Sequence, residues 1–289
     1  MPMKRVSGDS GERRPLSVET FGDLAGELLR HVEQPDFLQV LGTFFAHALA
    51  FDNYIVYRYQ DRRAAELLHT NLDDATLRSS MAPYISGLYL LDPFYLAATQ
   101  GRRRGVLRMD EIAPEAFTES DYYQMFYKNV NVIDEVRFVV EINGEELVHL
   151  FLEREEPHMR YTPEEVALVR NLENFVTAFI ERHWDWRARS AALPPDDRAP
   201  LAFSVRNIIR NLKQRALTPR EIDVVELTMQ GHSSKSVAHE LGISEGTVTI
   251  HKRNVYTKLD ISSQSQLFHL FLQALLGTTP TLESGNRPD

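Results

Sequence analysis

The chain has 289 residues, 43% hydrophobic and 25% charged, a composition typical of folded globular domains and long enough for two of them. It contains no cysteine, which excludes disulfides, thiol nucleophiles and cysteine-ligated metal sites. The net charge of −9 is uneven, because residues 1–200 hold 22 basic and 33 acidic side chains whereas residues 201–289 hold 10 and 8, so any surface for a polyanion is expected in the C-terminal part.

Polar stretches divide the chain into two domains. Residues 1–15 and 278–289 are rich in glycine, proline, serine and charge and are expected to be disordered tails. In residues 187–202 a Pro-Pro pair and a third proline interrupt every apolar period, as in a linker. The first domain is therefore expected over residues 16–186 and the second over residues 203–277.

Two helices and a hairpin are predicted at the start of the first domain. Ser17–Val32 and Pro35–Leu49 carry apolar residues at helical spacing. Phe51–Tyr59 alternates aromatic and β-branched residues, and the charged turn Gln60–Arg63 leads into Ala64–Thr70. This arrangement predicts two antiparallel strands.

The middle of the first domain is rich in tyrosine and ends in a second hairpin. Met81–Thr99 and Thr118–Lys128 are predicted to be helical. Val132–Ile142 and Glu145–Arg154 flank Asn143–Gly144, and an Asn-Gly pair supplies the positive φ angles of a two-residue type I′ turn.

A long helix is predicted to close the first domain. Thr162–Glu165 forms a capping box with proline at the first turn, and an apolar stripe continues to about Trp184. Helices, hairpin, helices, hairpin and a closing helix describe an α+β domain in which helices flank an antiparallel sheet. This order resembles GAF/PAS-like sensor folds and the sensor half of LuxR-type regulators.

The C-terminal part has the signals of a helix-turn-helix. Thr218–Glu221 is a second capping box and starts a helix with one apolar stripe. Ser233 or Ser234 caps a short helix, Gly242 suits a left-handed turn, and Ser244 caps a third helix. A short helix, a glycine turn and a longer helix with a positively charged outer face are typical of a DNA-reading unit.

This segment resembles the DNA-binding domains of the LuxR/NarL family, an all-α four-helix fold. The family pattern is Leu-Thr-x-Arg-Glu, then Gly, then Ile/Val-Ala-x-x-Leu, then Ile-Ser-x-x-Thr-Val-x-x-His and Lys-Leu. The matching positions here are Leu217, Thr218, Arg220, Glu221, Gly231, Val237, Ala238, Leu241, Ile243, Ser244, Thr247, Val248, His251, Lys258 and Leu259.

The resemblance implies which side chains contact double-stranded DNA. The third helix would enter the major groove, with Thr249, Ile250 and Arg253 facing base edges. The family usually has lysine where this chain has Thr249, so the preferred DNA site is expected to differ. Residues expected near phosphates are Ser234, Lys235, Thr247, His251, Lys252 and Lys258.

The resemblance also implies a homodimer. The fourth helix of the family pairs two subunits, and residues 262–276 supply an apolar stripe for this contact or for packing within one subunit. RNA polymerase is a further partner expected of a transcription regulator. The stripe residues considered for dimerisation are Leu267, Leu270, Phe271 and Ala274.

The first domain lacks the marks of two common sensors. The only early Asp-Asp pair, Asp73–Asp74, follows no apolar strand, which argues against a phosphoacceptor receiver. Asp92–Pro93 after two tyrosines resembles part of the set that binds acyl-homoserine lactones, but both tryptophans, Trp184 and Trp186, lie beside the linker. The lactone alternative is weakened and stays open.

The tyrosine-rich middle of the first domain is the candidate effector site. Aromatic rings and hydroxyl groups around an acid could orient a small polar or amphipathic ligand, or they could be core residues of an ordinary domain. Asp134–Glu135 is either a strand entrance or a ligand anchor. The candidate ligand-binding residues are Tyr57, Tyr84, Tyr89, Asp92, Tyr95 and Tyr122.

No enzyme, metal or cofactor is predicted. The chain has no glycine-rich phosphate loop, no Gly-x-Ser-x-Gly and no His-Glu-x-x-His, and its ten histidines show no ligand spacing. It also lacks the apolar core of a signal peptide and any run long enough for a membrane span, so a cytoplasmic protein without membrane contact is expected. The alternative to a small-molecule sensor is a first domain that binds a partner protein or only dimerises.

Overall fold

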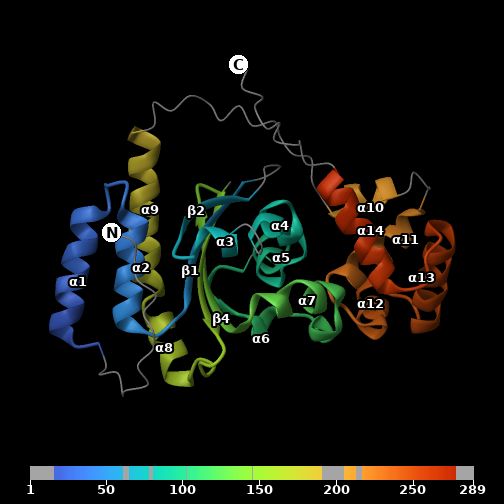
Figure 1. The fold of residues 1–289 in the computed structure, drawn as a ribbon, viewed down its shortest axis with the longest axis horizontal. Helices are drawn as coiled ribbons and strands as arrows, with labels where there is room; N and C mark the ends of the chain where they lie inside the picture. Colours follow the sequence, from blue (N-terminus) through green and yellow to red (C-terminus); the bar gives the residue numbers. More distant parts are fainter. Residues whose placement is uncertain are drawn as a thin grey trace.

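The computed structural model describes residues 16–60, 65–77, 81–101, 103–144, 146–190, 205–212 and 217–277. Both predicted tails and most of the predicted linker lie outside the described residues. An α+β domain is followed by an all-α domain, as the sequence predicts (Figure 1). No helix of the described residues is both long and apolar enough to cross a bilayer.

A five-stranded antiparallel sheet forms the centre of the first domain, with the strand order β2-β1-β5-β4-β3. Alternate residues point to opposite faces of each strand, so each face has its own hydrophobic cluster. The strands are β1 (Asn53–Gln60), β2 (Glu66–Thr70), β3 (Gly105–Arg108), β4 (Val132–Ile142) and β5 (Glu146–Glu155).

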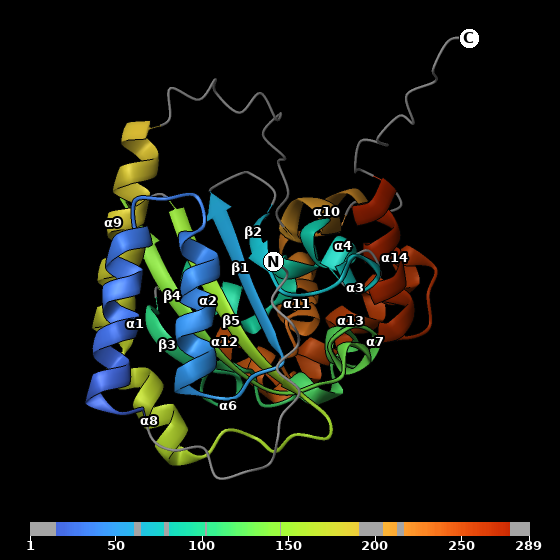
Figure 2. The same cartoon turned by 60° about the vertical axis from the view of Figure 1, so that its left-hand side comes forward.

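One face of the sheet is covered by helices from both ends of the domain (Figure 2). Their apolar residues pack on Val56, Phe138 and Leu150 of the three central strands. The helices are α1 (Val18–His31), α2 (Phe37–Ala48), α8 (Pro163–Asn171) and α9 (Glu173–Ser190).

Short helices cover the opposite face of the sheet. They hold most of the tyrosines and lie between the sheet and the C-terminal domain (Figure 1). These elements are α3 (Asp74–Thr76), α4 (Ala82–Ile85), η2 (Leu88–Leu91), α5 (Pro93–Thr99), α6 (Met109–Ile112), η3 (Phe117–Glu119), α7 (Asp121–Met125) and η4 (Tyr127–Val130).

Both predicted hairpins are confirmed. β1 and β2 pair antiparallel, and β4 and β5 are joined through Asn143 and Gly144, with φ of 53° and 73°. Two consecutive positive φ angles are the requirement of a type I′ turn.

Three predicted helices are interrupted and one strand was not predicted. The helix expected over Thr118–Lys128 is divided into η3, α7 and η4. The helix expected over Met81–Thr99 is broken at Gly87, whose φ of +136° ends α4. The closing helix is two helices that meet at Leu172, and the second extends four residues into the predicted linker. β3, a four-residue edge strand, is too short to give a sequence pattern.

The C-terminal domain contains the four predicted helices, preceded by α10 (Val205–Asn211). Val224, Val237, Ala238 and Val248 form the small core between the first three of these four. They are α11 (Pro219–Met229), α12 (Ser234–Leu241), α13 (Glu245–Leu259) and α14 (Gln264–Gly277).

The two domains share one hydrophobic cluster. It contains Tyr84 and Leu88 of the first domain and Phe268 and Leu275 of α14. α14 contacts α7, and Figures 1 and 2 both place the C-terminal helices beside the layer of short helices.

Candidate functional site

Local capping defines each helix of the candidate DNA-reading unit. The side chain of Thr218 accepts a hydrogen bond from the Glu221 amide, and Glu221 reciprocates, which completes the predicted capping box of α11. Ser233 caps α12, Gly242 ends it with a φ of 63°, and Ser244 caps α13. The caps satisfy amide groups that would otherwise have no partner at the helix ends.

α13 presents two distinct faces. Val248 and Val255 are fully buried against the rest of the domain. Thr249 and Arg253 are exposed, and Ile250 is 60% exposed. The three residues predicted to face base edges therefore lie together on the outer face of α13.

The residues predicted near phosphates lie on α12 and α13. The Lys252 Nζ donates a hydrogen bond to the Ser234 hydroxyl at 3.3 Å, so the N-terminus of α12 and the middle of α13 are adjacent. Burial lowers the pKa of Lys252. Lys235 is exposed at the first turn of α12, whereas Thr247 and His251 are half-buried on α13.

Lys258 has a second role besides its predicted phosphate contact. Its Nζ lies 2.7 Å from a carboxylate oxygen of Glu221. Burial alone would raise the pKa of Glu221, but hydrogen bonds from Lys258 and Thr218 lower it below the usual value. Lys258 thus ties the end of α13 to the capping box of α11.

The stripe predicted for dimerisation is covered to different degrees within a single chain. Leu267 and Phe271 are fully buried, and Leu270 and Ala274 are half-buried. Another row of α14 contacts the first domain: the Ser265 hydroxyl donates to an Asp121 carboxylate oxygen at 2.7 Å, and Leu275 packs against Gly87.

The residues predicted to bind a ligand lie together on one face of the sheet. The Tyr84 hydroxyl lies 2.8 Å from the Tyr59 hydroxyl and donates to an Asp92 carboxylate oxygen at 2.7 Å. Ring contacts between centroids 5.0 to 6.2 Å apart connect Tyr57, Tyr59, Tyr84, Tyr89 and Tyr95. Tyr122 joins this cluster through the Phe126 ring.

Arg137 of β4 occupies the centre of this tyrosine cluster and was missed by the sequence reasoning. Its Nη1 donates to Asp92 at 2.8 Å, and its Nε donates to Glu135 at 2.7 Å. The guanidinium carbon lies 3.9 Å and 3.6 Å from the ring centroids of Phe94 and Phe151. A lone arginine within an apolar strand, on the same face as Glu135, was the available signal.

Asp92 is fully engaged by the protein itself. Its second carboxylate oxygen accepts the Phe94 amide at 2.8 Å as the cap of α5. The side chain therefore has three donors: the Phe94 amide, the Tyr84 hydroxyl and Arg137. Burial opposes the charge of Arg137, but Asp92 and Glu135 hold the pKa of its guanidinium well above the usual value.

Two carboxylates face each other beside Arg137. Glu135 and Glu153 are cross-strand partners on β4 and β5, and both are buried. Burial, followed by the charge of Glu135, raises the pKa of Glu153 to about 8. Among the described residues, Arg137 is the one cation beside the carboxylates of Asp92, Glu135 and Glu153. Glu153 is therefore largely protonated at neutral pH.

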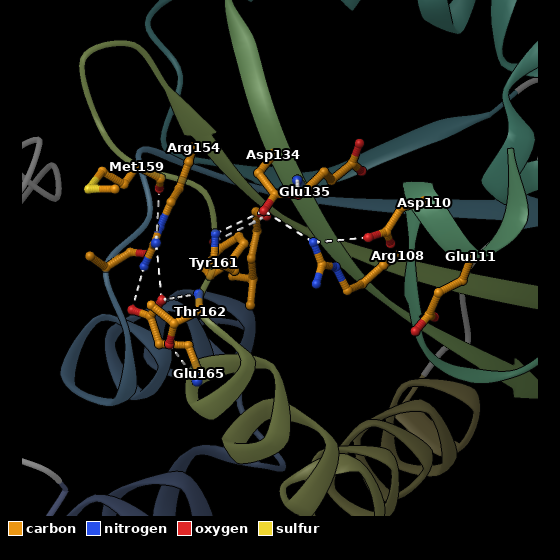
Figure 3. Close-up of polar contacts among 12 residues, drawn as sticks. Arg108, Asp110, Glu111, Asp134, Glu135, Arg154, Met159, Tyr161, Thr162 and Glu165 are labelled. Carbon is orange, nitrogen blue, oxygen red and sulfur yellow. Dashed lines mark hydrogen bonds and ion pairs between the residues drawn. The ribbon is translucent and has the colours of Figure 1, made fainter. Parts of the chain in front are cut away.

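Asp134 and Glu135 point to opposite faces of the sheet. Asp134 accepts the Tyr161 amide at 2.8 Å and an Arg108 nitrogen at 3.4 Å, which fixes the segment before α8 (Figure 3). Only Glu135 reaches the tyrosine cluster. Tyr54 also faces away from it, toward α2.

The helix-turn-helix of α12 and α13 is joined to an α+β domain with a buried polar centre. This architecture is that of a DNA-binding transcription regulator. Residues 215–271 match the family model of bacterial regulatory proteins of the luxR family. The C-terminal domain belongs to this LuxR family, which is a family of regulators and not of enzymes.

Two relatives are similar over different parts of the chain. An HTH-type transcriptional regulator in the exeN 3′ region of Aeromonas salmonicida is 29% identical over 189 residues, or 64% of this chain and 95% of the relative. The nitrate/nitrite response regulator protein NarP of Escherichia coli strain K12 is 47% identical over 57 residues, which are 20% of this chain and 26% of NarP. The similarity to NarP is thus confined to about a quarter of that protein.

One solved structure resembles the first domain. The VqsR LBD domain from Pseudomonas aeruginosa is 27% identical, with a TM-score of 0.51 over 57% of this chain and 97% of that domain. The α+β sensor-type fold predicted from the sequence is therefore confirmed.

Proposed function

We propose that the chain is a dimeric transcription regulator whose DNA affinity is controlled by a small molecule bound in the first domain. The observation that carries the DNA-binding part is the outer face of α13, where Thr249, Ile250 and Arg253 are exposed together. An arginine fork matches the O6 and N7 acceptors of guanine, an apolar side chain matches the thymine methyl group, and a threonine hydroxyl can hydrogen-bond to more than one base in the major groove.

Phosphate contacts would come from the surface formed by Lys235, Lys252 and Ser234. Cationic and hydroxyl groups at the start of α12 would hold the duplex in register while α13 reads the bases. Two copies on a roughly two-fold symmetric site follow from the family resemblance, with α14 as the expected pairing element.

The control of DNA affinity would pass through the contact between the domains. Gly87 lies two residues after α4, which carries Tyr84 of the tyrosine cluster, and it touches Leu275 of α14. A ligand that favours one arrangement of the tyrosine cluster would favour one placement of α14, and thereby change DNA affinity.

The test of DNA binding is a selection of random duplexes by the full-length chain. We expect enrichment of a two-fold symmetric sequence bound by two copies, measured by fluorescence anisotropy and light scattering. Failure to enrich any sequence would overturn the DNA-binding proposal.

The test of control is a thermal-shift screen of the full-length chain with metabolites and acyl-homoserine lactones. A compound that raises the melting temperature saturably should also change the affinity for the selected duplex. Stabilisation without any change in DNA affinity would contradict ligand control and leave DNA binding intact.

A further inference from the structure

A cavity of about 480 Å³ lies between α5 and the end of the sheet where the β4–β5 turn is located. Its volume is within the range of small-molecule sites. The rings of Tyr59 and Tyr95, with Ala98 and Leu147, supply the apolar part of its wall. The remaining lining residues are Gln60, Thr99, Arg104, Glu141, Gly144 and Glu146.

The charged groups of this cavity are already compensated. Arg104 forms an ion pair with Glu141. Glu146 accepts hydrogen bonds from Gln60 and from the Trp184 indole, and it lies 3.9 Å from Arg58. The cavity therefore presents no free charge for an ionic ligand and is suited to a neutral one.

His149 is a buried polar side chain behind the wall of this cavity, and it contacts the lining residue Tyr59. It lies on the same face of β5 as Leu147, two residues away, and its ring is 4.6 Å from the Tyr59 ring. Its side chain is completely buried, and neither ring nitrogen has a hydrogen-bond partner within the described part of the chain.

The imidazole of His149 is neutral, because burial and the charges of Arg137 and Arg104 lower its pKa well below the usual value. A neutral imidazole has one donor and one acceptor nitrogen. Buried polar groups nearly always have partners, so two orphaned ring nitrogens beside a cavity indicate a hydrogen-bonding molecule. Asp92 differs in this respect, since three protein donors already engage it.

We propose that the cavity binds a neutral amphipathic molecule whose ring or short alkyl chain lies between Tyr59 and Tyr95 and whose hydroxyl or carbonyl group hydrogen-bonds to His149. The imidazole is completely buried behind Tyr59 and Leu147, which line the cavity, so these two side chains must move apart for the hydroxyl or carbonyl group to reach it. This inference rests on the proposed function, and it names the ligand class and a binding residue that the sequence did not indicate.

The test uses 4-ethylphenol, a neutral ring with one hydroxyl group, and the full-length chain. Its binding is followed by calorimetry and by the ¹⁵N shifts of labelled histidine, with the His149 signals assigned by their loss in H149F. We expect saturable binding that moves the His149 signals, and at least tenfold weaker binding by H149F, which keeps an aromatic ring but has no ring nitrogen.

The matched control is H69F, the same substitution at a histidine that packs on Tyr54. It should bind the probe as the wild type does. T99W, which fills the cavity from α5, should abolish binding. Absence of probe binding by the wild type, or equal binding by H149F, would overturn the proposal.

The two proposals fail separately in these measurements. Affinity of the wild type and of H149F for the selected duplex is measured without the probe. Loss of DNA binding by the wild type would count against the proposed function alone, whereas intact DNA binding with no probe effect on His149 would count against the cavity site alone.

Discussion

Single side chains on α13 decide how this protein would read DNA. Arg253 is exposed and in no ion pair that the structure records for the described residues, so its guanidinium is available for two parallel hydrogen bonds to a guanine. Thr249 is shorter than the lysine that the family usually has, so it reaches fewer atoms of the groove.

Replacing Arg253 should remove a contact to one base pair. For R253A we expect about 1–3 kcal/mol weaker binding to the selected duplex and relaxed preference at one position of each half-site. Anisotropy titrations against duplexes with single base changes measure both effects. Unchanged affinity would mean that α13 is placed wrongly in the groove.

Replacing Lys252 should act on all sequences alike. Its ammonium group lies between α12 and α13, where phosphates are expected, and phosphate contacts carry no sequence information. K252A should weaken selected and random duplexes to the same extent and reduce the slope of log affinity against log salt by about one. A loss confined to the selected duplex would assign Lys252 to base reading instead.

The protonated Glu153 should make the first domain sensitive to pH. Its pKa rises from 4.5 in the unfolded chain to about 8 in the folded domain, so the folded state retains a proton that the unfolded state releases. The contribution of this proton to the free energy of unfolding is fully present below pH 4.5 and is lost as the pH rises to 8. Unfolding free energy should fall by up to about 5 kcal/mol across this window.

The control for this pH dependence is E153Q. The amide keeps the shape of the protonated carboxyl and can still accept a hydrogen bond from Asn53, but it cannot ionise. Urea unfolding of E153Q should therefore show a flatter pH profile, and the variant should be the more stable protein at pH 8. Parallel profiles of the two proteins would refute the assignment to Glu153.

At the scale of elements, one hydrogen-bond network joins segments far apart in the chain. From Tyr59 it passes through Tyr84, Asp92, Arg137 and Glu135 to Tyr127, and so links β1, α4, α5, β4 and η4. Short helices have little stability of their own, so this network and the rings around it hold the helical layer on the sheet.

Removing the centre of the network should be costly. R137M leaves Asp92 and Glu135 buried without their cation, and we expect a loss of about 3–5 kcal/mol of stability. R170M breaks the exposed pair with Glu111 and should cost less than about 1 kcal/mol. Urea unfolding followed by tryptophan fluorescence reports on the first domain, since both tryptophans lie on α9; equal effects of the two variants would contradict this difference.

At the scale of the whole molecule, the contact between the domains decides whether a ligand can influence DNA binding. The contact includes the hydrogen bond from Ser265 to Asp121, and Phe117 of η3 lies against Gly231 at the end of α11. Polar and apolar contacts therefore connect the tyrosine-rich layer to α14 and to the end of α11 in the DNA-binding domain.

The chain has no cysteine, so this contact can be tested by a cross-link without background. The double variant D121C/S265C should react with a short bis-maleimide to give an intramolecular product, because the native side chains are 2.7 Å apart. D121C and S265C alone serve as controls and should not give it. A product formed only between two molecules would show that the domains are not joined in this way in solution.

Much of the fold could be predicted because its signals are local. The capping boxes at Thr162 and Thr218 and the Asn-Gly turn mark helix starts and a hairpin through hydrogen bonds and φ preferences within four residues. Gly87 and Leu172, where predicted helices are interrupted, gave weaker local signals than the apolar periods around them.

The two candidate sites also differed in how much of each could be predicted from local signals. The residues predicted to read DNA were chosen from fixed spacing along one helix, and all three are exposed on α13. The tyrosines and Asp92 could be chosen for their chemistry, but the central place of Arg137 could not, because it depends on which strands are neighbours. His149 looked like any residue of an apolar strand until its lack of partners was known.

The sequence by itself determined the two-domain order, the helix-turn-helix and its family, because these depend on short-range patterns and fixed spacing. Only the tertiary structure decided that Arg137 fills the centre of the tyrosine cluster, that Glu153 faces Glu135, and that part of α14 packs on the first domain. The physical reason is that burial and charge pairing arise between residues distant in sequence, and their energies depend on the surroundings that folding creates.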